Sequence, residues 1–352
     1  MTRIGIVGAG RAATLHAEAL RALPGVELAG ICGADPLSTR VATLAGVHGS
    51  PVLALPELVE RSDALVVAIP PGRRSDVVAP AAGVVGAVLV ESPLASTLAA
   101  ARSLVSEATA SGPVMVGLNL LHAPAVRQAL TLVGEMDRPH HLELRVSAPP
   151  PHRRPDVRRS FGGGVVLDPG AHLLPVLMAA AGSAVRRVSA RIDRDRYGVD
   201  TSARLRLDHV DDRFSEATLV WTGGSATASL EVADSTSVVR VDLLPVPTVE
   251  RDGRVVVLAV DPNPMVALGF VGQLARLVGA ARGSSHAWPP ASVGAGVVAV
   301  AVAAAVSAAS EGDEVDVSEV PLDLAPAEIL AGHDRSGEGS PPAAPGSGGD
   351  MR

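Results

Sequence analysis

Short, continuously apolar runs rich in β-branched residues alternate with Ala-rich stretches along residues 1–120. Such runs are typical of strands buried on both faces of a parallel sheet, and the stretches between them have helical character. The alternation predicts a doubly wound α/β domain of the Rossmann type, with ligands at the carboxyl ends of its strands. The expected strands are residues 4–7, 26–32, 64–69, 87–90 and 114–117.

The pattern changes in the second part of the chain, where apolar and polar positions alternate within successive runs. Consecutive runs of this kind predict an open, mostly antiparallel sheet with one face packed on helices. We therefore expect a second, α+β domain over residues 121–325 for substrate binding and oligomer contacts. Its expected strands are residues 142–147, 185–191, 203–208, 217–221, 226–232 and 238–243.

Two further segments and the tail complete the expected architecture. Residues 264–282 predict one helix with Val266, Phe270, Leu274 and Leu277 on a core-facing side. Residues 287–310 carry no formal charge, but they consist mainly of Ala, Gly and Val and lack the Leu, Ile and Phe of a membrane span, so we expect a buried helix. The Gly/Ser/Pro-rich residues 332–352 are expected to be disordered.

Composition then restricts the chemistry. The chain has 352 residues, and all 30 of its basic side chains are Arg. The absence of Lys excludes a Schiff base to the protein, a Walker-type phosphate loop and a Lys general acid. Proton transfer must therefore be carried out by His, Asp, Glu or the single Tyr. A net charge of −7 argues against a nucleic-acid or anionic-membrane partner. One cysteine, Cys32, and the lack of a charged-then-apolar leader predict a cytosolic protein.

A glycine-rich turn follows the first expected strand. Gly8-Ala9-Gly10-Arg11-Ala12-Ala13 is a G-x-G-x-x-A pattern at the start of a helix expected over residues 11–23. The first Gly permits a tight turn, the second lets a pyrophosphate approach the backbone, and Ala13 keeps helix and strand close. A purely structural turn is the alternative, but its place at the start of a repeated βα pattern favours dinucleotide binding. The predicted contacts are Gly8, Gly10, Arg11, Ala12 and Ala13.

The choice between NAD and NADP depends on the end of the second strand. An acid about 20 residues after the turn would hold the ribose 2′-hydroxyl, but the position 20 residues after Ala13 is Gly33. Asp35 lies two positions later and is within reach of the ribose. Gly33 also leaves room for a 2′-phosphate beside Ser38, Thr39 or Arg40, so both cofactors stay open, with a slight preference for NADP.

Later motifs resemble the Gfo/Idh/MocA family, named after glucose–fructose oxidoreductase and inositol dehydrogenase. Pro70-Pro71 is similar to the family's Thr-Pro turn beside the nicotinamide, and Val116-Gly117-Leu118-Asn119 to its Val-Gly-Phe-Asn strand. Glu91-Ser92-Pro93 stands where the family has Glu-Lys-Pro. Residues 162–172, with three glycines followed by Asp168-Pro169-Gly170-Ala171-His172, resemble its Gly-Gly-Gly and Asp-x-Gly-x-His segment. The resemblance implies an NAD(P)-dependent oxidoreductase with Pro70, Pro71, Glu91 and Asn119 at the cofactor.

Three positions depart from that family pattern. Ser92 replaces the family Lys that donates a proton to, or orients, the reacting oxygen. A Ser hydroxyl can form hydrogen bonds, but without a partner it is no reservoir acid. Arg74 replaces a family His, and Leu120 and Leu121 replace an Arg pair. Ordinary sugar or polyol oxidation is therefore less expected.

Asp168 and His172 remain as catalytic candidates. Their i, i+4 spacing at the start of a helix turns both side chains the same way. The resemblance places this pair beneath the nicotinamide, where His172 would exchange a proton while Asp168 and Ser92 orient the substrate. The alternative is a helix-terminal acid and a core His.

The remaining candidates are weaker. Arg153, Arg154, Arg158 and Arg159 lie in a Pro-rich loop that would either bind an anionic substrate group or be solvated. His140-His141 has no third ligand at metal spacing, so no metal is expected. Tyr197 and His122 are either pocket residues or, more simply, structural ones.

Two functional hypotheses follow. The first is hydride transfer between a nicotinamide and a small carbonyl, alcohol or imine substrate, less polar than a free sugar and of specialised metabolism. The second is a redox-neutral lyase or isomerase, or a catalytically degenerate binding partner. The resemblance also implies a homodimer or homotetramer formed through the second sheet.

Overall fold

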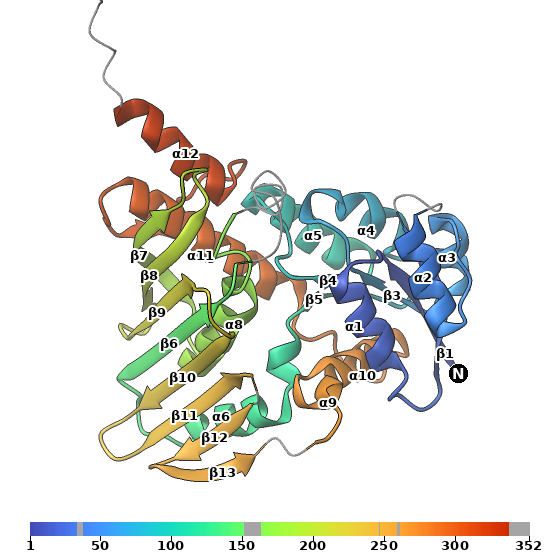
Figure 1. Ribbon diagram of the computed structural model, residues 1–352, viewed down its shortest axis with the longest axis horizontal. Helices are drawn as coiled ribbons and strands as arrows, with labels where there is room; N and C mark the ends of the chain where they lie inside the picture. The colour runs from blue at the N-terminus through green and yellow to red at the C-terminus, as the bar shows by residue number, and fades with distance from the viewer. Residues whose placement is uncertain (34–37, 151–162, 246, 259–260, 338–352) are drawn as a thin grey trace, which may run out of the picture.

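The computed structural model describes residues 1–33, 38–150, 163–245, 247–258 and 261–337, which form two sheets and the helices around them (Figure 1). The first sheet has the strand order β2-β1-β3-β4-β5 and is parallel throughout, as predicted. Chain order reverses between β1 and β3, which places a ligand crevice at the carboxyl ends of these two strands. The strands are β1 (Thr2–Val7), β2 (Val26–Cys32), β3 (Ala64–Val67), β4 (Ala87–Glu91) and β5 (Val114–Gly117).

Alternate residues of this parallel sheet supply two separate cores. Ile4, Val66 and Leu89 point to one face, where they pack with α1 (Arg11–Leu20), α2 (Thr39–His48) and α10 (Phe270–Ala281). Leu65, Val88 and Val116 point to the other face, toward α3 (Leu55–Arg61), α4 (Ser75–Ala81), α5 (Leu98–Ser111) and α11 (Ala291–Ala309). Both faces are covered, which explains the continuously apolar strands.

One strand and one helix of this domain end earlier than expected. Strand β3 ends at Val67 and not at Ile69, because Pro70 and Pro71 lead into the short helix η1 (Pro71–Arg73). Helix α1 ends at Leu20 and not at Leu23. The N–H groups of Ala22 and Leu23 bond three residues back, and Leu23 precedes Pro24, which disfavours a helical conformation.

The second sheet is larger and mostly antiparallel, again as predicted. Its order is β13-β12-β11-β10-β6-β9-β8-β7-β14, and only the β6–β9 pair is parallel among the described strands. Strands β12, β13 and β14 are additions to the expected set. The strands are β6 (His141–Ala148), β7 (Val185–Arg194), β8 (Asp200–His209), β9 (Phe214–Trp221), β10 (Thr227–Ala233), β11 (Val238–Leu244), β12 (Thr248–Arg251), β13 (Arg254–Leu258) and β14 (Val315–Asp316).

Helices α6 (Pro124–Gly134), α8 (Gly170–Ala181) and α11 cover one face of the second sheet (Figure 1). Helix α11 is long and apolar enough to cross a membrane, but it packs against β7 on one side and α5 on the other, as expected for a buried helix. Helix α12 (Pro326–Gly337) lies against α11, with Leu330 buried. Residues 332–337, expected to be disordered, are therefore helical, and residues 338–352 lie outside the described part.

The single helix expected over residues 264–282 is wrong. The chain forms α9 (Pro264–Ala267) and α10, which are separated by Leu268 and Gly269. Gly269 has φ +83, and a Cβ there would overlap with the carbonyl oxygen of Asn119. Because the break changes the phase of the pattern, Val266 is half-buried whereas Met265 is buried. Close contact with another segment overrides the helical periodicity here.

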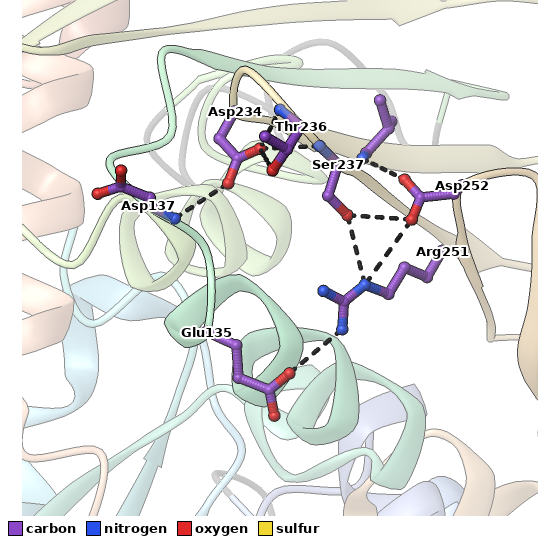
Figure 2. A network of polar contacts seen from close by, with 8 residues as sticks. Glu135, Asp137, Asp234, Thr236, Ser237, Arg251 and Asp252 are labelled. Carbon is purple, nitrogen blue, oxygen red and sulfur yellow. Dashed lines mark hydrogen bonds and ion pairs between the residues drawn. The ribbon is translucent and has the colours of Figure 1, made fainter.

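Polar contacts tie the β10–β11 hairpin to the segment after α6 (Figure 2). The Asp234 carboxylate accepts hydrogen bonds from the backbone N–H groups of Thr236, Ser237 and Asp137 at 2.7, 2.8 and 3.0 Å. These bonds lower the pKa of Asp234 to about 2. Arg251 adds an ion pair to Glu135 at 3.2 Å.

Candidate active site

The glycine turn between β1 and α1 has the geometry expected of a phosphate cradle. Gly8 has φ +121, and a Cβ would overlap with the carbonyl oxygen of Ala68, directly after β3, so only glycine fits. Gly10 is exposed, and a Cβ there would meet nothing within 4 Å. Ala13 is buried against the strand. Gly10 is the N-cap residue of α1 and has no side chain that could cap the helix. Among the described residues, the first N–H groups of α1, including those of Arg11 and Ala12, therefore remain available to bind an anion.

The end of β2 forms the adjacent part of this edge. Gly33 follows the strand and is half-buried, while Ser38 precedes α2 and Arg40 is exposed in its first turn. Asp35, the acidic candidate for the ribose, lies outside the described residues. Arg40 is thus a described cation near the place expected for the ribose 2′-group of the cofactor.

A buried arginine organises the carboxyl ends of β3 and β4. Arg74 is 2% exposed and donates to the carbonyl oxygens of Ile69, Glu91 and Pro93, the first at 3.0 Å. Burial lowers its pKa to about 10, although the Glu91 carboxylate opposes that shift, so the guanidinium stays protonated at neutral pH. Pro70 is exposed at the mouth of the crevice and Pro71 is buried. Arg74 supports the backbone around Ser92 and is no free substrate ligand.

Glu91 is buried and fully engaged by other protein groups. Its Oε1 lies 2.5 Å from Nε2 of His16 on α1, and its Oε2 accepts from the Ser92 N–H at 3.0 Å. Burial raises the Glu91 pKa, but the His16 hydrogen bond and the charges of His16, His172 and Arg74 outweigh it, so the pKa is lower than usual. Glu91 therefore stabilises the positions of His16 and of the Ser92 backbone beside the predicted cofactor site.

Ser92 joins the two sheets at the centre of the site. Its hydroxyl donates to the carbonyl oxygen of Ala171, 79 positions further along the chain, at 3.0 Å. Ala171 lies in the first turn of α8, directly before His172. This bond brings the start of α8 to the carboxyl end of β4. The Ser92 proton is thereby committed to the backbone, and only its lone pairs remain for a substrate.

His172 lies in the first turn of α8, whereas Asp168 lies in the turn before the helix and not in the helix itself as expected, because α8 begins only at Gly170. Both are half-buried, and no hydrogen bond or ion pair of either side chain is formed with the described residues. The Ser92–Ala171 hydrogen bond places the residue directly before His172 at the end of β4, and the His172 charge contributes to the lowered pKa of Glu91. His172 thus lies near the end of β4, and neither its side chain nor that of Asp168 is engaged by another described residue.

The end of β5 is closed by packing. The Asn119 amide donates to the carbonyl oxygen of Leu268 at 2.8 Å, so it holds the α9–α10 break. Leu120 and Leu121 are buried. His122 is buried against the Trp288 ring at 5.1 Å between centroids, and burial, with help from Arg276 and Arg127, lowers its pKa to about 4. His122 is thus a neutral core residue.

Comparisons with known proteins agree with this geometry. Residues 2–118 match the family model GFO_IDH_MocA, described as an oxidoreductase family with an NAD-binding Rossmann fold. The solved structure of GenD2 from gentamicin A biosynthesis, in complex with NAD, matches with a TM-score of 0.78 at 23% identity, covering 90% of this chain and 96% of that one. Residues 2–118 thus match the NAD-binding domain of the Gfo/Idh/MocA family, and the solved structures show that the fold is shared over most of the chain.

Other solved structures share this fold. An oxidoreductase domain protein from Kribbella flavida has a TM-score of 0.77 at 21% identity, over 90% of this chain and 100% of that one. UDP-N-acetylglucosamine 3-dehydrogenase GnnA from Acidithiobacillus ferrooxidans has a TM-score of 0.74 at 18% identity, over 87% and 97%. No curated protein sequence matches the chain.

The residues of this site fit a dinucleotide. The open position at Gly10 and the N–H groups at the start of α1 suit a pyrophosphate, and ligands of such sheets bind at the carboxyl ends of the strands, where β4 ends at Glu91 directly before Ser92. Among the described residues, no group of His, Cys, Asp or Glu could hold a metal ion.

Sequence reasoning missed some residues of the site and gave others a different role. His16 was missed, although its place on the buried face of α1 with Ala13 and Leu20 is a usable signal. Arg74 was interpreted only as a lost His. Tyr197 is 43% exposed between β7 and β8, and its hydroxyl lies 2.7 Å from Arg196. The four loop arginines lie outside the described residues.

Proposed function

We propose that this protein is an NAD(P)-dependent oxidoreductase acting on a small carbonyl, alcohol or imine substrate. The Ser92–Ala171 hydrogen bond carries the proposal, because it brings His172 to the edge of the parallel sheet that bears the glycine turn. When bound, the nicotinamide would accept or supply a hydride at C4. The oxidoreductase family of residues 2–118 supports the reaction class.

The protein's own residues would handle the substrate proton. The His172 ring nitrogens form no hydrogen bond with another described residue, and His172 would take the proton from a substrate hydroxyl during oxidation, or return it during reduction. Asp168, four residues earlier, would orient the imidazole or bind a second hydroxyl. Ser92 would act mainly by fixing α8, since its own proton is already donated to Ala171.

The substrate would be an intermediate of specialised metabolism, less polar than a free sugar. Leu120 and Leu121 are buried where the family resemblance leads one to expect arginines, which removes two cationic substrate contacts. GenD2, which shares the fold, belongs to gentamicin A biosynthesis. A panel of modified sugars and small ketones is therefore the first choice for assays.

A turnover assay tests the reaction class. Nicotinamide absorbance would be followed with the substrate panel for the natural protein, His172→Ala and Ser92→Lys. Turnover in the natural protein that disappears in His172→Ala supports the proposal. An inactive natural protein whose Ser92→Lys variant turns over substrate would overturn it and favour the second candidate, a degenerate or redox-neutral family member. The committed Ser92 hydroxyl is the observation that favours that candidate.

NADP is the cofactor that Arg40 favours. Its exposed guanidinium at the start of α2 would pair with a 2′-phosphate beside Gly33. Arg40→Ala would then weaken NADPH binding about tenfold, the value of one exposed charge-assisted contact, and leave NADH binding unchanged. Equal loss for both cofactors would contradict the assignment.

A second copy of the chain would cover the open face of the large sheet. This face carries a hollow of about 630 Å³ lined by residues of β6, β9, β10, β11 and β12, among them Arg145, Thr218 and Ser229. Light scattering on the purified protein would give the mass of a dimer or tetramer, and Thr218→Glu with Ser229→Glu would shift it toward a monomer. A natural protein that is monomeric at all concentrations would exclude this assembly.

A further inference from the structure

Three consecutive backbone N–H groups converge on Asp200 at the start of β8. Gly164 donates to Oδ1 at 2.6 Å and Val166 to Oδ2 at 2.9 Å. Val165 donates to the carbonyl oxygen of Asp200 at 3.0 Å. One residue thus takes up every backbone donor of residues 164–166.

Glycine is required where this turn meets Asp200. A Cβ on Gly164 would overlap with the Asp200 carbonyl oxygen and lie 2.7 Å from its Oδ1. Gly163 has φ +152, a conformation that L side chains rarely adopt. The glycine run therefore serves a close approach between protein segments at its last two positions. This explains two of the three glycines without any ligand.

The clamped turn leads directly to the proposed acid–base residues. The Asp168 N–H donates to the Gly164 carbonyl oxygen at 2.9 Å, and Gly170 N–H to that of Val165 at 3.0 Å. Helix α8 begins at Gly170 and carries His172 in its first turn. The position of both side chains is thus set by a turn whose other end is held by Asp200.

Burial of the Asp200 carboxylate costs free energy of solvation. Asp200 is 2% exposed, and burial raises its pKa although the N–H bonds from Val166 and Gly164 oppose the shift. No ion pair with a described Arg or His compensates the charge. Buried carboxylates cost free energy unless their oxygens are hydrogen-bonded, and here each oxygen accepts one backbone N–H bond.

We propose that Asp200 is a positioning residue for Asp168 and His172. It acts through the backbone of residues 164–168 and touches neither substrate nor cofactor. The catalytic part of this inference rests on the proposed function, but the positional part does not. Ser92 fixes the first turn of α8 from the parallel sheet, and Asp200 fixes the preceding turn from the antiparallel sheet.

Asp200→Asn tests the inference, with Asp234→Asn as the matched control. Both changes replace a carboxylate that accepts backbone N–H bonds, but Asp234 lies in the β10–β11 hairpin (Figure 2). Histidine-labelled protein would be observed by NMR, with the His172 imidazole signal identified from His172→Gln. Hydrogen exchange of residues 164–168 and the Kd for NADH and NADPH would be measured on the same samples.

The expected result is specific to Asp200. Asp200→Asn shifts the His172 imidazole signal and speeds exchange at residues 164–168, with unchanged dinucleotide Kd, whereas Asp234→Asn changes neither. With an active substrate, Asp200→Asn lowers kcat by about tenfold or more and leaves KM nearly unchanged, as expected when a catalytic group is misplaced. Gly163→Ala, a milder change in the same turn, produces the same shift if Asp200→Asn does not fold.

Two results would overturn the inference. One is a natural His172 signal and natural exchange in folded Asp200→Asn, and the other is an equal response in Asp234→Asn. If the proposed function is wrong, the result is different. His172→Gln then has no effect on turnover, whereas the signal and exchange changes in Asp200→Asn persist.

Discussion

Single residues in this protein divide into those whose role is local and those whose partners lie far along the chain. Gly8 and Gly10 were predictable, because a tight turn between strand and helix has a local sequence pattern. Ser92, by contrast, was expected to orient a substrate, but its hydroxyl is bound to Ala171. Arg74 was interpreted only as a lost His and holds three carbonyl oxygens. Such partners depend on the tertiary fold and leave no local signal.

Arg74→Met is expected to lower the free energy of unfolding by about 3–5 kcal/mol, because it leaves buried carbonyl oxygens unpaired and removes one of the positive charges near Glu91. Urea unfolding measures the change. Arg73→Met is the matched control, since Arg73 is exposed and its ion pair to Asp76 is long at 3.8 Å. A control loss as large as that of Arg74→Met would contradict the account.

His122 predicts a pH dependence of stability. Its pKa is about 4 in the folded protein against 6.5 for the free side chain, so only the unfolded chain gains a proton between these values. Stability is therefore fully present above about pH 6.5 and is lost progressively as the pH falls toward 4, by up to about 3 kcal/mol. His122→Phe, which keeps a ring against Trp288, should flatten the difference in urea unfolding between these pH values. An unchanged slope in the variant would assign it to other groups.

For helices and strands, the hydrophobic periodicity predicted which elements exist and of which type they are better than it predicted where they begin and end. All five parallel strands and the sheet of the second domain are present. The helix over residues 264–282 failed at Gly269, where contact with Asn119 interrupts it. The contact joins segments about 150 positions apart, and no window of local sequence contains both partners.

Gly269→Ala should destabilise the protein by more than about 2 kcal/mol, because a Cβ overlaps with the backbone of residues 119–123 and φ is positive. Gly283→Ala provides the control: φ is +67 there, but a Cβ meets nothing within 4 Å, so only about 1 kcal/mol of conformational strain is expected. Thermal unfolding of the two variants gives the comparison. Equal losses would mean that strain and not contact fixes the break.

At the scale of the whole molecule, helix α11 joins the two sheets through one continuous apolar core. Val88 and Val116 of the parallel sheet share this core with Leu144 and Leu205 of the second sheet. The sequence predicted that this helix is buried, but not that both sheets pack against it. Composition identifies an apolar helix without specifying its neighbours.

Gly294 allows a close approach of α11 to the parallel sheet. A Cβ there would lie 2.9 Å from Cβ of Leu94 and 3.0 Å from Cγ2 of Val116. Gly294→Val should cost about 2–3 kcal/mol by overpacking, whereas Gly296→Val, with open space to 3.9 Å, should cost less than about 1. Calorimetry should show one transition for the natural protein. Two separate transitions would contradict a shared core.

Binding of a nicotinamide dinucleotide at the turn from Gly8 to Ala13 underlies the proposed function, and fluorescence titration with NADH and NADPH measures it. We expect saturable binding of at least one of them, and a loss of about a hundredfold or more in Gly10→Glu, whose carboxylate would occupy the space of the pyrophosphate at the α1 N-terminus. Gly46→Glu, at another open glycine, should bind as the natural protein does. Failure of the folded natural protein to bind either dinucleotide would contradict the account.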